Sequence, residues 1–402
     1  MNDQPSAIHD LVIIGAGPAG LALARALGED ELNVAIVDPT PREALAEAPF
    51  DGREIALSTD SVAHLRDYGI WPYIPDEDIS RLRDARVLDG GTRSALHLQA
   101  DGAGELGWLV PNYQLRRASY ASLADAAQLS WYTARVTALQ TAPGHAEVQL
   151  DDGRRLRARL VVAADSRFSE TRRAMGIAAR MRDFGKSMLV CRLEHELPHR
   201  QTAEEWFVYG ATLALLPLNG SRSSLVLTQP HRQIAALAQA APEDFAARIG
   251  DWTGHHLGRL SLASSRHVYP LVAVWAEQFC KERYALIGDA AVGMHPVTAH
   301  GYNLGLRSVA TLANAVRAAQ RRGADIGALA LLRGYEAEHR RAARPLYELT
   351  NALVGLYTDE RLPARLARRA ALQLTEHLPP LKRLIVAPLR RRGERRPGIA
   401  PG

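Results

Sequence analysis

The hydrophobic positions near the N-terminus follow the alternation of a strand, a helix and a second strand. An apolar run at Leu11–Ile14 precedes a helical pattern at Pro18–Leu27, and another apolar run follows at Val34–Val37. Short apolar runs separated by a segment of helix length predict parallel strands joined by a crossover helix. Two more buried strands are predicted much later, at Arg159–Ala163 and Tyr284–Ile287. The pattern therefore predicts a parallel sheet assembled from distant parts of the chain.

The segment between the last two of these strands has a different pattern. Residues 185–275 contain apolar runs of strand length with one helical stretch, whereas the chain beyond residue 300 has a helical period. The predicted strands are Met188–Leu193, Trp206–Tyr209, Leu213–Leu216 and Ser224–Thr228, with earlier ones near Arg135–Leu139 and Ala146–Leu150. The predicted helices are Ser61–Tyr68, Leu115–Ala127, Pro242–Asp251, Asn303–Gln320 and most of 325–375. A β-rich second domain is therefore expected to interrupt the first, followed by a helical C-terminus.

Length and composition agree with a two-domain arrangement. The chain has 402 residues, 47% hydrophobic and 23% charged, which is typical of a packed soluble protein and excludes a disordered chain, a collagen or a small disulfide scaffold. Two cysteines, Cys191 and Cys280, build neither a disulfide framework nor a four-thiolate metal site, which favours a reducing compartment. The sequence has no apolar run of about 18 residues, as a membrane span requires, and no basic flank typical of a signal peptide. We therefore expect a cytoplasmic protein.

The formal net charge of +5 is concentrated at the C-terminus. Residues 361–402 contain eleven basic and two acidic residues, a net +9, whereas the preceding part contains 38 basic and 42 acidic residues, a net −4. A solvated helix face would explain this tail. So would an electrostatic contact with a partner assembly or with anionic lipid at the inner face of the membrane, because the apolar Leu384–Leu389 lies among the basic residues. Nucleic-acid binding is disfavoured because no aromatic residue accompanies the arginines.

A glycine-rich turn follows the first predicted strand. Its residues are Gly15-Ala-Gly17-Pro-Ala19-Gly20, and Asp38 ends the next strand 21 residues beyond Gly17. In such a turn the first glycine allows a tight bend, the second lets the backbone approach a pyrophosphate, and the third lets helix and sheet pack closely. The helix N-terminus offers N–H groups to phosphate, and the acid accepts from a ribose hydroxyl. The turn therefore predicts a dinucleotide site, without deciding between FAD and NAD.

Two further acidic residues, Asp165 and Asp289, each follow a predicted buried strand. Ligands of α/β sheets bind at this carboxyl edge. Beyond Asp289 the ring of Pro296 fixes a loop, and Gly301 and Asn303 open a helix whose N–H groups point back toward the site. Such a helix end can stabilise negative charge on a ring as well as on a phosphate.

On these residues the chain resembles the class A flavoprotein aromatic hydroxylases, and within them the ubiquinone-biosynthesis hydroxylases. The resemblance covers most of the chain. Besides the glycine turn it includes Asp51-Gly-Arg53-Glu-Ile-Ala-Leu-Ser58, Ala164-Asp-Ser-Arg-Phe-Ser169, Leu213-Ala-Leu-Leu-Pro217-Leu218 and Gly288-Asp289-Ala-Ala-Val-Gly-Met-His-Pro-Val-Thr-Ala-His-Gly301. The second and fourth of these segments are similar to the branch described as 5-demethoxyubiquinol hydroxylases.

The resemblance implies an α/β fold of the para-hydroxybenzoate hydroxylase type. In that fold a Rossmann-like FAD-binding domain is interrupted by a β-sheet substrate domain and followed by a helical C-terminus. We assign residues 1–75, 106–182 and 277–345 to the discontinuous FAD-binding domain, 76–105 and 183–276 to the β-rich substrate domain, and 346–402 to a basic helical C-terminal segment.

Carried over position by position, the resemblance implies FAD as the bound cofactor and NAD(P)H as a transient co-substrate. The glycine turn and Asp38 would hold the ADP half, Asp289 the ribityl chain, and Asp165 both FAD and NAD(P)H. The full set of implied cofactor-binding residues is Gly15, Gly17, Ala19, Gly20, Asp38, Arg53, Asn112, Arg116, Asp165, Asp289, Pro296, Gly301, Tyr302 and Asn303. No catalytic side chain is assigned; the candidates in the flavin loop are Pro296, His300 and Asn303.

The sequence departs from the family pattern at three places. Ser166 follows the acid where the family has glycine, Val292 replaces a histidine, and Ala299-His300-Gly301 replaces Gly-Gln-Gly. A histidine at position 300 either adds a titratable group beside the flavin or faces solvent, and both interpretations remain open.

One motif predicts a different chemistry. The segment His195-Glu-Leu-Pro198-His199 matches the zinc-protease pattern, which needs both histidines on one face of a helix. Pro198 would break that helix. We therefore predict a turn here and no metal site.

The resemblance implies a monooxygenase that hydroxylates the aromatic ring of a prenylated phenol or quinol of ubiquinone biosynthesis through a flavin hydroperoxide, using NAD(P)H and O2. Two alternatives remain open. One is an FAD-dependent prenyl-lipid reductase or dehydrogenase of the same fold, and the other is a flavin-binding accessory subunit of a quinone-biosynthesis assembly. Incorporation of labelled oxygen separates the first alternative from the hydroxylase, and substrate-stimulated NADPH oxidation separates the second.

Overall fold

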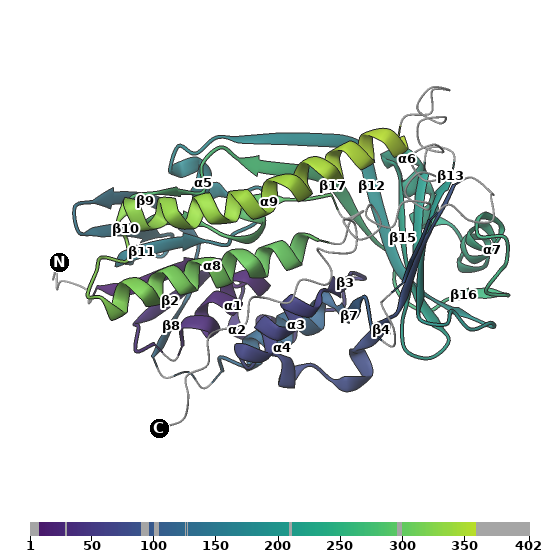
Figure 1. The fold of residues 1–402 in the computed structure, drawn as a ribbon, viewed down its shortest axis with the longest axis horizontal. Helices are drawn as coiled ribbons and strands as arrows, with labels where there is room; N and C mark the ends of the chain where they lie inside the picture. The colour runs from purple at the N-terminus through teal and green to yellow at the C-terminus, as the bar shows by residue number, and fades with distance from the viewer. Residues whose placement is uncertain are drawn as a thin grey trace.

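Two large sheets lie at opposite ends of the molecule, with a small sheet and two helices, α3 (Thr59–Asp67) and α4 (Asn112–Ala121), between them (Figure 1). This arrangement is that of a computed structural model, which describes residues 8–28, 30–89, 96–99, 104–124, 126, 128–208, 211–295 and 300–358.

The first sheet is parallel at its centre and has eight strands within the described residues. β1 (His9–Ile14) lies between β11 (Arg155–Ala163) and β2 (Val34–Asp38), and Ile14 pairs with Ala163 on one side and Val37 on the other. The carboxyl ends of these strands therefore meet at one edge. The remaining strands are β8 (Leu129–Thr133), β9 (Val136–Ala142), β10 (His145–Leu150), β18 (Cys280–Lys281) and β19 (Tyr284–Leu286).

Burial explains why these strands read as continuous apolar runs. Leu11, Val12 and Ile13 of β1 are fully buried, as strands of a parallel sheet covered on both faces must be. α1 (Pro18–Leu27) packs against α8 (Gly301–Arg321), which in turn packs against α9 (Leu329–Thr358). The N-terminal crossover helix and the C-terminal helices thus share one core.

The second sheet is largely antiparallel, and nine of its strands lie in the described residues, in the order β20-β17-β12-β15-β14-β13-β5-β6 with β16 beside β12. One face packs on α6 (His231–Gln239) and α7 (Pro242–Trp252). The strands are β5 (Asp84–Asp89), β6 (Leu96–Gln99), β12 (Ala179–His195), β13 (Thr202–Val208), β14 (Ala211–Pro217), β15 (Arg222–Pro230), β16 (Leu260–Leu262), β17 (His267–Ala276) and β20 (Val292–Gly293).

The opposite face of this sheet, which carries Ala214, Leu216 and Val226, is called the inner face here. Its side chains are only half-buried, whereas Leu213 and Leu215, which point to the helices, are buried. A small sheet of β3 (Glu54–Leu57), β7 (Gly107–Pro111) and β4 (Ser80–Leu82) borders it. Within one apolar cluster, Ala56 and Leu109 of the small sheet contact Leu216 and Leu218. The inner face therefore looks toward the first sheet and its helices.

Short elements complete the connections. They are α2 (Arg42–Ala46), α5 (Glu170–Ala174) and the 3-10 helices η1 (Trp71–Tyr73), η2 (Asp76–Asp78) and η3 (Gly288–Ala290). No helix in the described ranges is long and apolar enough to cross a membrane.

The structure confirms the α/β fold class, and it corrects several predicted elements. The helix predicted to reach residue 127 ends at Ala121, because a turn follows, and α6 was not predicted because it is short and buries only Ile234 and Leu237. β17 was missed because Pro270 argues against a central strand; it pairs with Ser187, where the register of β12 and β17 shifts.

Two of the predicted domain borders fall inside continuous elements of the structure, β12 and α9. The border between residues 182 and 183 falls inside β12, a single strand of 17 residues that starts earlier than the sequence pattern indicated. Residues 346–358 of the predicted C-terminal segment continue α9, which runs through Pro345 without ending. The basic tail, 361–402, lies outside the described residues.

Candidate active site

The glycine turn between β1 and α1 has the shape that a dinucleotide requires. Gly15 has φ +109°, and a Cβ there would lie 2.5 Å from the Ala164 carbonyl oxygen, so glycine is required. At Gly17, by contrast, no described atom lies within 4 Å of the position a Cβ would take. Gly17 is also the N-cap of α1, and no described side chain caps this helix end. The open space and the N–H groups at Gly17 suit a pyrophosphate.

Asp38 lies at the mouth of this turn, at the end of β2. Its Oδ2 accepts from the backbone N–H of Ala16 at 2.7 Å, and its Oδ1 accepts from that of Thr40 at 2.8 Å. The carboxylate therefore fixes the turn, and its remaining lone pairs can accept from a ribose hydroxyl. Gly20 is buried in α1. The residue before it, Ala19, lies close to Gly288, because a Cβ placed on Gly288 would be 3.1 Å from the Ala19 Cβ.

Asp289 stands beside the same edge, in η3 directly after β19. Its Oδ2 accepts from the Arg167 guanidinium at 2.9 Å, and both side chains are partly exposed. The neighbouring Gly288 N–H donates to Ser308 Oγ of α8 at 3.0 Å. Asp289 therefore lies between the first turn of α1 and helix α8, where a cofactor can displace the arginine.

The Asp165 side chain points toward α5. Its Oδ2 accepts from the Thr171 hydroxyl at 2.9 Å in α5, while its Oδ1 is buried without a hydrogen-bond partner in the described residues. The next residue, Ser166, has φ +125°, a backbone conformation that favours glycine. The family glycine at this position therefore has a conformational reason, and serine adopts the same backbone.

Asn303 acts on the backbone of β3. Its Oδ1 accepts from the Ser58 N–H at 2.9 Å, and its Nδ2 donates to the Ala56 carbonyl at 2.8 Å. Asn303 therefore joins the N-terminus of α8 to the end of β3, and we interpret it as a positioning residue.

The N-terminus of α8 carries three more candidate residues, His300, Gly301 and Tyr302. His300 is its N-cap residue but does not cap it with its side chain, and no described atom lies within 4 Å of a Cβ placed on Gly301. Burial raises the pKa of Tyr302, whose hydroxyl has no hydrogen-bond partner in the described part. Pro296 lies outside the described residues.

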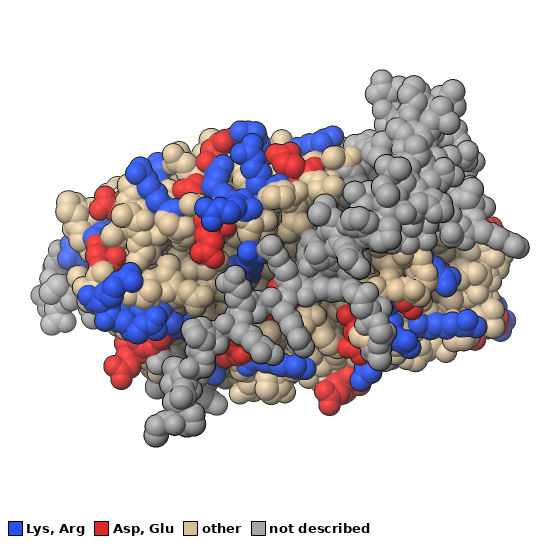
Figure 2. Space-filling view, in the orientation of Figure 1, with Lys and Arg blue, Asp and Glu red and all other residues tan. Residues whose placement is uncertain are grey.

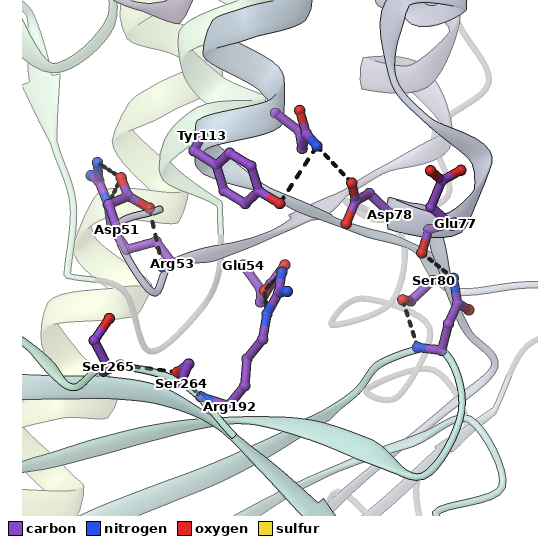
Figure 3. A network of polar contacts seen from close by, with 12 residues as sticks. Asp51, Arg53, Glu54, Glu77, Asp78, Ser80, Tyr113, Arg192, Ser264 and Ser265 are labelled. Carbon is purple, nitrogen blue, oxygen red and sulfur yellow. Dashed lines mark hydrogen bonds and ion pairs between the residues drawn. The ribbon is translucent and has the colours of Figure 1, made fainter. Parts of the chain in front are cut away.

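Arg53 and Asn112 both donate to an acid that the sequence did not single out, Asp51, and Figure 3 shows the Arg53–Asp51 pair. Arg53 Nε and Nη2 donate to Asp51 Oδ2 at 3.1 and 2.5 Å, and Asn112 Nδ2 donates to the same oxygen at 2.7 Å. Arg116 lies one turn after Asn112 on α4. Burial raises the pKa of Tyr269, and the positive charge of Arg116 partly offsets that rise. The structure thus brings Arg53 and Asn112 together through Asp51 and places Arg116 near Tyr269, whose hydroxyl donates to the Asp51 carbonyl.

A second unpredicted pair joins β3 to the inner face of the second sheet (Figure 3). Arg192 Nε and Nη2 of β12 donate to Glu54 Oε1 at 2.9 and 2.7 Å, and the Glu54 side chain is fully buried. Burial raises the pKa of Glu54 to about 7 against the opposing effect of Arg192. In the sequence, Glu54 lies within a family motif, and no local signal marks Arg192 as its partner.

The zinc-protease pattern folds as predicted, as a strand end and a turn. His195 is the last residue of β12, and its Nε2 is hydrogen-bonded to Ser223 Oγ at 3.1 Å. His199 Nε2 is hydrogen-bonded to the Leu218 carbonyl at 2.7 Å. In the residues that the structure describes, no group of three or more His, Cys, Asp or Glu is arranged to hold a metal.

These residues together define a protein that binds an extended dinucleotide. The glycine turn, Asp38, Asp289 and the N-terminus of α8 line the carboxyl edge of the parallel sheet, the position where such folds bind their ligands. The space at Gly17 and Gly301 fits a cofactor that passes from one helix N-terminus to the other. The chain belongs to the FAD binding domain family, whose model matches residues 9–350.

Individual relatives agree with this family. The chain is 43% identical over 387 residues to the ubiquinone hydroxylase UbiM of Neisseria meningitidis, covering 94% of this chain and 84% of that protein. It is 39% identical over 381 residues to the ubiquinone hydroxylase UbiL of Rhodospirillum rubrum, covering 94% and 89%. These matches confirm the predicted resemblance to the ubiquinone-biosynthesis hydroxylases.

Solved structures share the fold. The structure of PqsL, a probable FAD-dependent monooxygenase from Pseudomonas aeruginosa, matches with a TM-score of 0.76 at 22% identity, over 91% of this chain and 99% of that chain. The p-nitrophenol 4-monooxygenase PnpA of Pseudomonas putida matches with a TM-score of 0.75 at 16% identity, over 96% and 99%. The predicted fold class, an α/β fold with a Rossmann-like FAD-binding part, is thereby confirmed.

Proposed function

We propose that this protein is an FAD-dependent monooxygenase that hydroxylates the aromatic ring of a prenylated phenol or quinol of ubiquinone biosynthesis, with NAD(P)H as reductant and O2 as co-substrate. The observation that carries the proposal is the 43% identity to UbiM over 94% of the chain, joined to a site edge that fits FAD.

The residues of the chain divide the work of binding. The α1 N-terminus at Gly17 and Asp38 would hold the ADP half of FAD, and Arg53 and Asp289 would hold its middle part. The N-terminus of α8 would lie at the flavin side, where its positive end can stabilise negative charge on the ring. Bound FAD supplies hydride acceptance and oxygen activation, which no side chain provides.

The inner face of the second sheet suits the substrate. Ala214, Leu216 and Val226 are apolar and only half-buried, so an aromatic ring with a prenyl tail can cover them. Asn303 and the Glu54–Arg192 pair hold β3 between this face and α8. A ring bound there is kept from water on one side by the sheet and on the other by the cofactor.

The direct test uses purified protein, FAD, NADPH, a short-tailed prenylphenol and labelled oxygen gas. Hydroxylated product that contains the label supports the proposal. Substrate-dependent NADPH oxidation with unlabelled product would establish the reductase or dehydrogenase instead. Protein that retains FAD but oxidises NADPH no faster with substrate would indicate the accessory subunit, and co-purifying partners would then be identified.

The basic tail supports a second, separate proposal: the protein works in the cytoplasm and contacts the inner membrane face through residues 361–402, with their net charge of +9. On the face shown in Figure 2, Lys and Arg lie among Asp and Glu, so the described body offers no comparable basic surface there. Co-sedimentation with vesicles rich in anionic lipid is expected for the full chain and is expected to fall with salt. A chain ending at residue 360 should stay in solution; equal binding of both would contradict this proposal.

A further inference from the structure

The two faces of β13 carry two neighbouring glutamates in opposite surroundings. Glu204 points to the helical side, where its Oε2 lies 2.6 Å from His256 Nε2. Trp206, on the same side, is buried beside Leu213 in the core under α7. Successive side chains of a strand point to opposite faces, so Glu205 lies on the inner face.

The surroundings of Glu205 are apolar. Its partners in register are Ala214 of β14 and Val87 of β5, and Val226 follows Ala214 in the next strand. Directly opposite Glu205, neither neighbouring strand presents a titratable side chain. Glu205 has no hydrogen bond or ion pair with the described residues, and burial alone raises its pKa to about 8.

This carboxyl nevertheless remains within reach of a small molecule. Glu205, Ala214 and Val226 all keep partial exposure on the inner face. A half-buried carboxylate that has apolar neighbours and no partner in the described residues is costly to keep ionised, which marks it as a candidate for ligand binding.

The same face is continuous with the cofactor side. Along the row that contains Glu205 and Ala214, Val190 of β12 lies against the Asp51–Arg53 segment: a Cβ placed on Gly52 would be 2.8 Å from Val190 Cγ2. Two residues further along β12, and so on the same face, Arg192 is paired with Glu54 of β3. Glu54 lies two residues before Ala56, whose carbonyl accepts from Asn303. Glu205 therefore stands on the sheet that faces the flavin-binding segments.

We propose that Glu205 binds the ring hydroxyl of the substrate and accepts its proton. In this step the phenolic O–H bond breaks, a new O–H bond forms on the Glu205 carboxylate, and the electron pair stays on the ring oxygen. The ring gains electron density at its ortho and para carbons, which favours attack on an electrophilic oxygen. The proposal rests on the proposed hydroxylase function.

A carboxylate in apolar surroundings is a stronger base toward a phenol than a solvent-exposed carboxylate is. A phenol has a pKa near 10, and a solvent-exposed glutamate has a pKa near 4.3, so an ordinary carboxylate is a weak base for it. Proton transfer becomes more favourable as the pKa of the base approaches that of the acid.

The test compares Glu205→Gln with the wild-type holoenzyme, using a 2-prenylphenol, NADPH and labelled oxygen. Glutamine keeps the size and a hydrogen bond but accepts no proton. We expect kcat for hydroxylation to fall by at least about 100-fold, with KM within about threefold and the bound FAD unchanged. Glu205→Asp should recover part of the rate, and Glu204→Gln, on the other face of the same strand, serves as the matched control.

The pH profile adds a readout that a purely structural role would not change. Wild-type kcat should fall as the pH drops through the pKa of Glu205, and this acid limb should be missing in Glu205→Gln. Hydroxylation by Glu205→Gln within about threefold of wild type would overturn the role of Glu205 alone. Absence of labelled product from the wild-type holoenzyme would instead overturn the proposed function, so the two failures are distinguishable.

Discussion

Ser166 holds a backbone conformation that glycine adopts more readily. Its φ of +125° costs a residue with a Cβ about 1–3 kcal/mol, while glycine loses about 0.4–1 kcal/mol through the greater freedom of its unfolded chain. Ser166→Gly should therefore raise the free energy of unfolding by about 1 kcal/mol, as measured by urea denaturation. Ser169→Gly is the matched control: it removes the side chain that caps α5 through the Arg172 N–H and should lower stability. A destabilised Ser166→Gly would contradict the strain argument.

Asp289 offers a test of the cofactor edge. Its carboxylate, partly exposed and held by Arg167, lies between α1 and α8, so Asp289→Ala should reduce FAD retention after gel filtration, measured as the ratio of flavin to protein absorbance. Asp152→Ala removes a surface carboxylate that is paired only with Arg154 and should retain FAD like wild type. A fully flavinated Asp289→Ala protein would refute this assignment.

The residues that could be predicted from the sequence are those whose role is local. Gly15, Gly17 and Asp38 follow from one turn and the strand after it, because spacing alone places them together. Asp51 could not be recognised as the residue that joins Arg53 and Asn112, since that contact spans 61 residues. Glu54 and Arg192 are 138 residues apart and meet only when the two sheets pack together.

The pair Glu54–Arg192 connects two elements, β3 and β12, and its removal should be costly. Arg192→Leu leaves the buried Glu54 carboxylate without its partner, so the free energy of unfolding should fall by about 3–5 kcal/mol. The double variant Arg192→Leu with Glu54→Leu replaces both charges by apolar groups and should regain most of that loss. Urea denaturation of wild type, Glu54→Leu, Arg192→Leu and the double variant gives the coupling energy. Additive losses would show that the two side chains do not depend on each other.

Helices and strands could be predicted where the apolar period of the sequence is unbroken. The prediction failed where tertiary contacts override that period. β1 and β2 follow the apolar pattern because the parallel sheet is covered on both faces, and α1 follows it because it packs between the sheet and α8. β17 could not be predicted because Pro270 sits in it, tolerated at the register shift opposite Ser187. β12 is longer than its apolar part because its first residues, Ala179–Asp183, pair with β17 while remaining largely exposed.

For the whole molecule, two buried histidines predict a loss of stability in mild acid. Burial lowers the pKa of His295 and His339 to about 4, below the value of 6.5 expected in the unfolded chain. The unfolded state therefore binds more protons between these values, so stability is full above pH 6.5 and falls as the pH drops toward 4, by at most about 1.4 kcal/mol per pH unit for each group.

The predicted loss of stability in mild acid can be tested at His339. Its ring stacks on Tyr335 and lies near Phe279, so Phe can replace it in aromatic surroundings. His339→Phe should show a shallower fall of the melting temperature between pH 6.5 and 4.5 than wild type. His145→Phe, on the edge hairpin β9–β10, is the control and should follow the wild-type curve. Parallel curves for wild type and His339→Phe would rule out this histidine as a source of acid sensitivity.

The order of strands in the first sheet has a consequence for synthesis on the ribosome. β1, β2 and β11 are complete by residue 163, but β19, which covers the outer edge of β11, is made only at 284–286, and α8, which packs on α1, only at 301–321. Until then the nascent chain exposes an unpaired strand edge and an uncovered helix face, while most of the second sheet, from β12 to β17, emerges. We therefore expect a chain that terminates between residues 163 and 300 to be less soluble than the full chain, as a comparison of the soluble fractions after expression would measure.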